Sequence, residues 1–275
     1  MTRLREIFLA PGALIIVALF LAPLCIVIDY SFLSRGAYGG VSEPLTTENY
    51  RRLFDPIYAE IIWRSFWIAG TATLLCLILG FPMALFIAQS KYRTLMLNLI
   101  MLPFWTSFLV RTYAWMFLLR DTGLFNSLLL RLHLIQSPLP LLFNNGAVVL
   151  GLVYGYLPFM ILPLYATIEK MDPALLDAAA DLGANPVTTI WKVVVPLNRG
   201  GIVAGSLLVF IPCLGAYLTP DLLGGGRTVM IGNLVQNQFT SARDWPFGSA
   251  ASLLMMGIVL LLLFGVIKKR GEELI

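Results

Sequence analysis

The chain has 275 residues, of which 59% are hydrophobic and only 12% are charged, and its formal net charge is +4. About a quarter of the residues in a soluble domain are charged, so this composition excludes a soluble protein and predicts an integral membrane protein. Six stretches approach the roughly 20 apolar residues that a membrane-spanning helix needs. They are residues 8–28, 61–88, 95–119, 147–168, 200–218 and 247–267. We therefore predict an all-α fold in which residues 1–275 form a single transmembrane domain with six helices.

The first span has a basic start, with Arg3 and Arg5, as a secretory signal peptide does. Its apolar stretch is too long for a signal peptide, and no small-residue cleavage site follows it. We expect this segment to stay in the protein as a membrane helix. It ends at Asp29 and Tyr30, an acid beside an aromatic ring.

The third span gathers aromatic and charged side chains, namely Phe104, Trp105, Phe108, Arg111, Tyr113 and Trp115. On an ideal helix, Phe104, Phe108, Arg111 and Trp115 share one face. A charge inside a membrane is costly unless it faces protein or water. Arg111 is therefore a candidate either for the solute pathway or for a structural ion pair.

Small residues open the fourth and fifth spans, at Gly151 and Gly155 and at Gly201 and Gly205. Glycines at this spacing allow the backbones of membrane helices to approach closely. Prolines inside the spans free backbone carbonyls that protein or water must satisfy. Broken helices of this kind are more natural around a pathway than in a simple anchor.

A hydrophilic loop, residues 169–199, separates the fourth and fifth spans. Asp172 and Pro173 are typical of an N-cap and of the first position of a helix. Gly183 supplies a residue that adopts positive φ just past the last turn. Asn185 and Pro186 then repeat the start signal. The loop is therefore predicted to hold two short helices joined by a sharp turn.

This loop has two interpretations. Its first helix, rich in alanine, is either an interfacial helix that rests on lipid headgroups or a surface that docks to another protein. Asp177 and Asp181 are acidic and no base accompanies them in that helix, which suits anionic lipid poorly. The small alanines also offer a close-approach surface rather than a deep apolar one, so docking to a protein is favoured.

Two further pairs of an acid and an aromatic residue follow, Tyr217 with Asp221 and Asp244 with Trp245. A carboxylate beside a ring provides Coulomb attraction and cation–π contact to an alkylammonium group. These residues and Asp29 are candidates for a cationic solute, and the alternative is that they are residues of the membrane–water interface.

The five lysines of the chain all lie in segments 89–94, 169–199 and 268–275. Because cytoplasmic loops carry an excess of positive charge, this distribution predicts that both termini and the loop 169–199 are cytoplasmic. The basic charge then needs no nucleic-acid partner.

Several kinds of chemistry are excluded. The single histidine, His133, excludes a metal site built on paired histidines. No phosphate-binding Gly-x-x-x-x-Gly-Lys-Ser/Thr motif is present, so energy must come from a partner or an ion gradient. Cys25, Cys76 and Cys213 lie within predicted spans and are interpreted as small apolar packing residues.

The loop 169–199 resembles a motif of ABC importer permeases, in which Glu-Ala-Ala is followed after three residues by Gly and after nine more by Ile-x-Leu-Pro. Asp177, Ala178, Ala179, Gly183 and Pro196 fall at that spacing, with valine at 193 and 195. The departures, Asp for Glu and Val for Ile and Leu, are conservative. From about residue 49 onward the chain also looks like the spermidine/putrescine branch of that family. The segments that carry this likeness are Leu102–Thr106, Val110–Tyr113, Leu157–Met160, Ile168–Lys170 and Arg243–Gly248.

The resemblance implies a type I ABC importer permease in the bacterial inner membrane, itself neither an enzyme nor a cofactor protein. Its implied partners are a second homologous permease, two copies of an ATPase that binds ATP and Mg²⁺, and a periplasmic solute-binding protein. Asp177 would contact a groove of the ATPase, and Gly183 would let the chain turn. A polyamine is the implied solute; an amino acid or an opine, and a homodimer of this chain, are alternatives.

Two other classes are weighed against this one. A secondary transporter or channel predicts an inverted internal repeat and acids in mid-span, and the sequence has neither. An integral membrane enzyme needs convergent polar groups at one membrane face, and the single histidine argues against most such sites.

Overall fold

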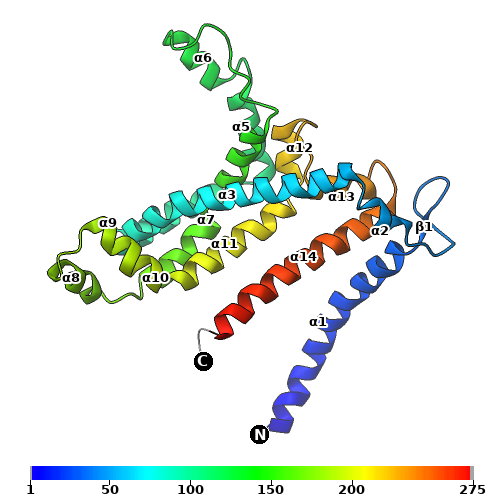
Figure 1. Cartoon of the computed structure of the whole chain (residues 1–275), viewed down its shortest axis with the longest axis horizontal. Coiled ribbons are helices and arrows are strands. Elements are labelled where there is room, and N and C mark those ends of the chain that lie inside the picture. Colours follow the sequence, from blue (N-terminus) through cyan, green and yellow to red (C-terminus); the bar gives the residue numbers. More distant parts are fainter. Residues whose placement is uncertain (1, 273–275) are drawn as a thin grey trace. The chain divides into compact units, whose positions relative to one another are not determined.

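The computed structural model describes residues 2–272, and its regular structure is almost entirely helical (Figure 1). The only strands in this described part are β1 (Ser34–Arg35) and β2 (Val41–Ser42), which pair as a short antiparallel ribbon. The prediction of an all-α fold is therefore confirmed. The chain divides into two compact units, Met1–Ile61 with Ile231–Ile275 and Ile62–Met230.

Four helices in residues 2–272 are long and apolar enough to cross a membrane on their own. They are α1 (Thr2–Ser31), α3 (Pro56–Gln89), α7 (Asn145–Ile168) and α14 (Trp245–Glu272). Two bent pairs of helices raise this number to six if each pair is one span. The six predicted spans agree with that upper number, and the two bent pairs account for the third and the fifth.

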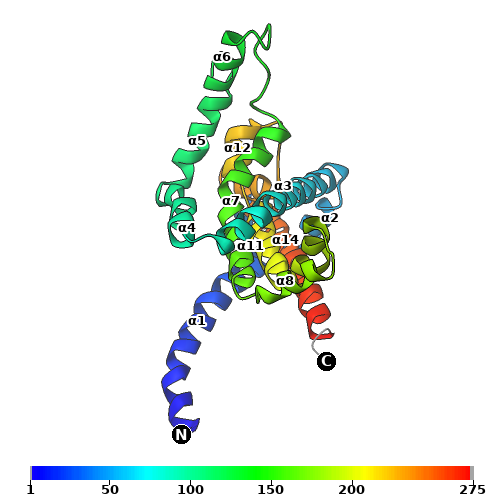
Figure 2. The same cartoon turned by 90° about the vertical axis from the view of Figure 1, so that its left-hand side faces the viewer.

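The third span differs from the prediction, because a single helix over residues 95–119 does not form. The chain instead makes α4 (Arg93–Met101), the 3₁₀ turn η1 (Leu102–Trp105), α5 (Phe108–Leu119) and α6 (Leu124–Arg131). The two halves meet at 87° (Figure 2). Pro103 lacks a backbone N–H and weakens the helix there. Thr106 is extended, and its hydroxyl donates to the Pro103 carbonyl at 2.7 Å.

The fifth predicted span also ends early. Helix α11 (Arg199–Leu214) stops four residues before the predicted limit at residue 218, and a separate short helix, α12 (Leu218–Gly224), follows. Gly215 comes directly after the last turn, and glycine is a poor helix former. Asp221 therefore lies in α12 and Tyr217 directly before it, and neither lies at the end of the membrane helix.

Helices α7 and α11 pack closely in the second unit (Figure 1). A Cβ on Gly201 would collide with Thr167, and one on Gly205 would lie 2.8 Å from the Met160 sulfur. Gly151 and Gly155 allow α12 and α5, respectively, to approach α7 closely. A Cβ on Gly155 would lie 3.0 Å from the ring of Phe108. Both glycine pairs thus occupy positions of close helix approach, as their spacing predicts.

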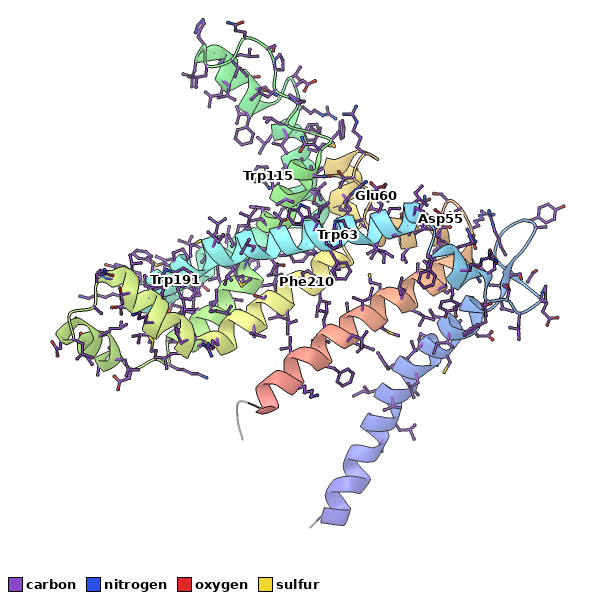
Figure 3. All side chains as sticks on the ribbon, viewed as in Figure 1. Asp55, Glu60, Trp63, Trp115, Trp191 and Phe210 are labelled. Atoms are coloured by element: carbon purple, nitrogen blue, oxygen red, sulfur yellow. The ribbon has the colours of Figure 1, made fainter. Side chains whose placement is uncertain are left out.

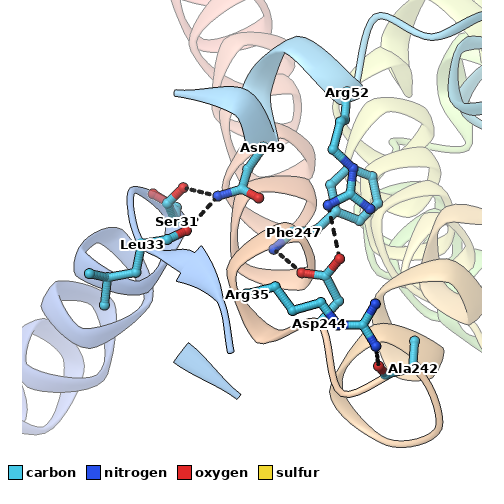
Figure 4. Close-up of polar contacts among 8 residues, drawn as sticks. All are labelled: Ser31, Leu33, Arg35, Asn49, Arg52, Ala242, Asp244 and Phe247. Carbon is cyan, nitrogen blue, oxygen red and sulfur yellow. Dashed lines mark hydrogen bonds and ion pairs between the residues drawn. The ribbon is translucent and has the colours of Figure 1, made fainter. Parts of the chain in front are cut away.

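The first unit contains α1, α2 (Glu48–Arg52), α13 (Ile231–Phe239) and α14. Its buried core consists of Leu53, Leu234, Phe247, Ala250 and Ala251. A polar cluster joins its segments (Figure 4). The Asn49 side chain donates to the carbonyls of Ser31 at 3.0 Å and Leu33 at 2.8 Å, which fixes the turn after α1.

Candidate functional site

The loop between α7 and α11 begins with a capped helix, α8 (Ala174–Asp181). The Asp172 carboxylate accepts the Ala174 N–H at 2.9 Å, and Pro173 has helical angles directly before α8. Gly183 has φ +77°, and its N–H donates to the Ala180 carbonyl at 2.8 Å. The predicted cap and the predicted left-handed turn are both present.

The second helix of the loop starts as its sequence predicts. The Asn185 side chain accepts the Thr188 N–H at 2.8 Å, and Pro186 is the first residue of α9 (Pro186–Thr189). The helix continues through a π turn, η2 (Ile190–Val194), into α10 (Val195–Leu197). The π turn ends two residues before Pro196, which has no N–H to complete an ordinary helical turn. The chain then bends by 74° into α11.

The motif residues of this loop have different environments. Asp177, Ala178 and Gly183 are exposed, Ala179 is buried and Pro196 is half-buried. Ala179 therefore supports the loop from inside, whereas Asp177 and Ala178 are free to contact another molecule.

Large apolar side chains on the loop are also exposed, among them Trp191, which is not part of the predicted motif. Leu182 is 89% exposed and Trp191 is 68% exposed; Figure 3 labels Trp191 on this loop. The opposite side of the loop faces the end of α3 across an apolar cleft of about 280 Å³, lined by Leu85 and Leu176 among others. We name the exposed surface of Asp177, Ala178, Leu182, Val187 and Trp191 the loop surface; exposed apolar groups of this kind mark interaction sites. The spacing of Val187 and Trp191, one helical turn apart, could have revealed it.

The candidates in the third span separate into groups. The Arg111 guanidinium lies 4.2 Å from the ring centre of Phe104 and 5.6 Å from that of Phe108. The prediction that Phe104 shares a face with Arg111 on one ideal helix is wrong, because the break at Thr106 lies between them. The chain brings the two side chains together across the break instead. Arg111 Nε and Nη1 are buried, with no hydrogen-bond partner in the described part of the chain.

The other aromatic candidates of this span point elsewhere. Trp115 packs in the second unit, with ring centres 6.3 Å from Phe125 and 5.5 Å from Tyr154 (Figure 3). Trp105 is 86% exposed, and Tyr113 is also exposed. The structure therefore does not gather these side chains with Arg111 into one site, and their role in a solute pathway stays a prediction.

Asp244 is engaged within the first unit. It is buried, binds Arg52 at 2.9 Å and accepts the Phe247 N–H at 3.3 Å (Figure 4). Burial alone would lower the pKa of the Arg52 guanidinium, but the hydrogen bonds and charges of Asp244 and Tyr58 together outweigh burial and raise this pKa. Asp244 therefore stabilises the start of α14, and its predicted contact with solute would require it to leave these partners.

The two other acids predicted to contact the solute are exposed. Asp29 is exposed at the end of α1, where the neighbouring Tyr30 stacks on Trp245 with ring centres 6.3 Å apart. In the other unit, Asp221 and Tyr217 are both exposed and lie one turn apart at the start of α12. Among the described residues, no three His, Cys, Asp or Glu side chains are grouped to hold a metal ion.

Comparison with known proteins identifies similar chains. The family model described as binding-protein-dependent transport system inner membrane component matches residues 76–270. The spermidine/putrescine transport system permease protein PotB of Haemophilus influenzae is 43% identical over 246 residues, which cover 89% of this chain and 86% of that protein. PotB of Escherichia coli K12 is 44% identical over 244 residues, covering 87% of this chain and 89% of that protein.

Solved structures with the same fold include a bacterial ABC transporter involved in the import of the acidic polysaccharide alginate. One of its chains matches with a TM-score of 0.74 and 17% identity, covering 97% of this chain and 96% of that chain. The alginate transporter in complex with an alginate-bound periplasmic protein matches with a TM-score of 0.71 and 18% identity, covering 94% and 92%. At these identities the likeness concerns the fold alone.

Proposed function

Because this chain belongs to the family of inner-membrane components of binding-protein-dependent transport systems, we propose that it is the permease subunit of an ABC importer for polyamines such as putrescine and spermidine. The predicted ABC importer permease fold is confirmed by the family match and by the solved structures. The observation that carries the solute class is the 43% identity to a spermidine/putrescine permease over 89% of the chain.

The partners follow from the same family. In the proposed assembly this chain pairs with a second, homologous permease. Two ATPase subunits bind on the cytoplasmic side, one of them to the loop surface of this chain, and a periplasmic binding protein delivers solute on the other side. ATP and Mg²⁺ belong to the ATPase subunits. Closure of the ATPase pair would move the loop 169–199, and the membrane helices would alternate between outward and inward access.

Uptake assays test this function directly. Cells that lack their own polyamine importers, but express this chain with its partners, are expected to accumulate labelled putrescine or spermidine. Uptake should stop when the ATPase subunit is made unable to hydrolyse ATP. Uptake of an amino acid or an opine in place of polyamines would refute the proposed solute class but would agree with an ABC importer. Uptake that follows an ion gradient without the ATPase would refute the importer.

The orientation of the chain has its own test. In a background that lacks Cys25, Cys76 and Cys213, we expect Leu182→Cys to react with membrane-impermeant thiol reagents only after the cytoplasmic side is opened. Tyr38→Cys should react from outside in intact spheroplasts. Both side chains are largely exposed, Leu182 at 89% and Tyr38 at 98%, so lack of access to the reagent reflects the membrane and not burial. The reverse labelling pattern would contradict the cytoplasmic position of the loop and its docking to the ATPase.

A further inference from the structure

An apolar groove lies between the end of α3 and α4, two helices of the second unit that a short turn connects (Figure 2). Its volume is about 260 Å³, and the side chains that line it are all apolar: Met83, Phe86, Ile87, Met96, Leu99 and Ile100. Ile87 is buried, whereas Phe86 and Leu99 are 66% and 56% exposed. The groove is therefore open to its surroundings, and each of the two helices contributes one apolar face to it.

The groove begins close to a polar turn. Helix α3 ends at Gln89, and α4 begins at Arg93. With a rise of 1.5 Å per residue, Met83 lies about 9 Å from the end of α3. Because α3 is long and apolar enough to cross a membrane, this distance places the groove in the hydrocarbon layer next to the headgroups. The groove then faces lipid tails, and the turn faces headgroups.

The turn and its neighbours carry positive charge. Lys91 is exposed, and no ion pair in the described part of the chain involves it. The Arg93 side chain is 53% exposed and binds Glu169 at 2.7 Å through Nη1; its guanidinium has further N–H groups that can bind a second acceptor. Lys170 follows Glu169 in the chain, so three bases and one acid give this cluster a net charge of +2.

A second apolar groove, in the first unit, lacks such a charge. It lies between α1 and α14, has a volume of about 360 Å³ and is lined by Leu19, Pro23 and Met256 among others. None of its described lining residues is charged. That surface accepts any lipid tail, whereas the groove beside Lys91 combines contact to a tail with attraction of an anion.

We propose that the groove between α3 and α4 binds an anionic phospholipid, with one acyl chain in the groove and the phosphate against Lys91 and Arg93. Anionic headgroups are attracted to basic residues beside membrane helices, and arginine donates paired hydrogen bonds to phosphate. The lining presents no polar group that would lose its hydrogen-bond partners under an acyl chain. Tyr92, 70% exposed in the turn, is typical of the membrane–water interface. The site does not depend on which solute is carried.

The first test concerns the headgroup. Native mass spectrometry of the purified full-length chain, titrated with dioleoyl phosphatidylglycerol or dioleoyl phosphatidylcholine, measures the affinity for the first bound lipid. The two lipids have the same acyl chains, and phosphatidylglycerol should bind more tightly. Lys91→Gln should weaken phosphatidylglycerol binding about five-fold. Lys268→Gln should leave it unchanged, because Lys268 is an equally exposed lysine in the last turns of α14, in the other unit.

The second test concerns the acyl chain. Met96→Trp places a larger side chain in the groove and should weaken binding of both lipids. Leu95→Trp is the matched control, because Leu95 is the preceding residue of α4, is 57% exposed and does not line the groove. Inorganic phosphate should not displace bound phosphatidylglycerol, because it makes no contact with the groove.

Four results would overturn the proposal. Equal affinity for the two lipids would exclude recognition of the anionic headgroup. Equal weakening by Lys91→Gln and Lys268→Gln would indicate general attraction to positive charge. Unchanged binding in Met96→Trp would place the lipid outside the groove. Loss of phosphatidylglycerol binding when the chain assembles with a second permease would show that a protein covers the groove. Absent polyamine uptake by the unmodified importer would refute the proposed function separately, because the lipid titration involves no solute.

Discussion

Replacing Gly183 by valine is expected to reduce solute uptake about ten-fold or more while the chain still inserts into the membrane. Gly183 has φ +77°, and no atom lies within 4 Å of a Cβ built there. The cost of the substitution therefore comes from the backbone conformation and not from a collision. Left-handed angles cost an ordinary L-residue about 1–2 kcal/mol, and they are a genuine outlier for a β-branched one. Relief of that strain would change the angle between α8 and α9 and displace Leu182 and Val187.

Two matched variants separate coupling from general strain. Gly183→Asn should retain most of the uptake, because asparagine tolerates the left-handed conformation. Gly226 has the same φ, +77°, and equally open surroundings, but it lies after α12. Gly226→Val should therefore introduce comparable strain and leave co-purification with the ATPase subunit intact. If Gly183→Val binds the ATPase and supports transport normally, the loop surface is not the coupling element.

The start and turn signals of this loop could be predicted from sequence because each depends on neighbours in the chain. Asp172 contacts a backbone group two residues away, and Asn185 contacts one three residues away. Such caps are set by short-range hydrogen bonds and survive any change in how the helices pack. The positive φ of Gly183 is local in the same sense.

The broken third span could not be predicted from hydropathy. A hydropathy window over residues 95–119 counts apolar side chains and contains no information on the direction of the backbone. The 87° bend depends on Pro103, on the extended Thr106 and on the packing of each half against different neighbours. The contact between Arg111 and Phe104 therefore arises from tertiary structure, even though a simple helical wheel suggested the same pair.

Asp244 shows why acid-and-aromatic pairs are ambiguous in a sequence. Its neighbour Trp245 is adjacent, but the partner that holds its carboxylate, Arg52, lies 192 positions away. Asp244 and Asp221 thus have similar local patterns, and only the folded chain shows that Asp244 is buried whereas Asp221 is exposed. This difference makes Asp221 the stronger candidate for solute contact.

Asp221→Asn is expected to lower the efficiency of polyamine uptake about ten-fold, with basal ATP hydrolysis retained. A charge pair at about 4 Å in an intermediate dielectric is worth roughly 4 kcal/mol before desolvation is subtracted. A net loss of about 1–2 kcal/mol remains, which corresponds to that factor. Asparagine keeps the shape of the side chain at this exposed position in the first turn of α12. The variant therefore removes the charge with little change in packing.

The comparison with Asp221→Glu and Asp121→Asn decides what the charge does. Asp221→Glu should be milder than Asp221→Asn, because it preserves the charge beside Tyr217. Asp121 is an exposed acid of the same unit, and its neutralisation reports the general electrostatic attraction of a cation to the surface. If Asp121→Asn lowers polyamine uptake as much as Asp221→Asn does, the electrostatic attraction of the solute is not specific to α12. If both Asp221 variants lower uptake equally, the role of Asp221 is in packing and not in its charge. A preference of the unmodified importer for a neutral or anionic solute would contradict the cation site altogether.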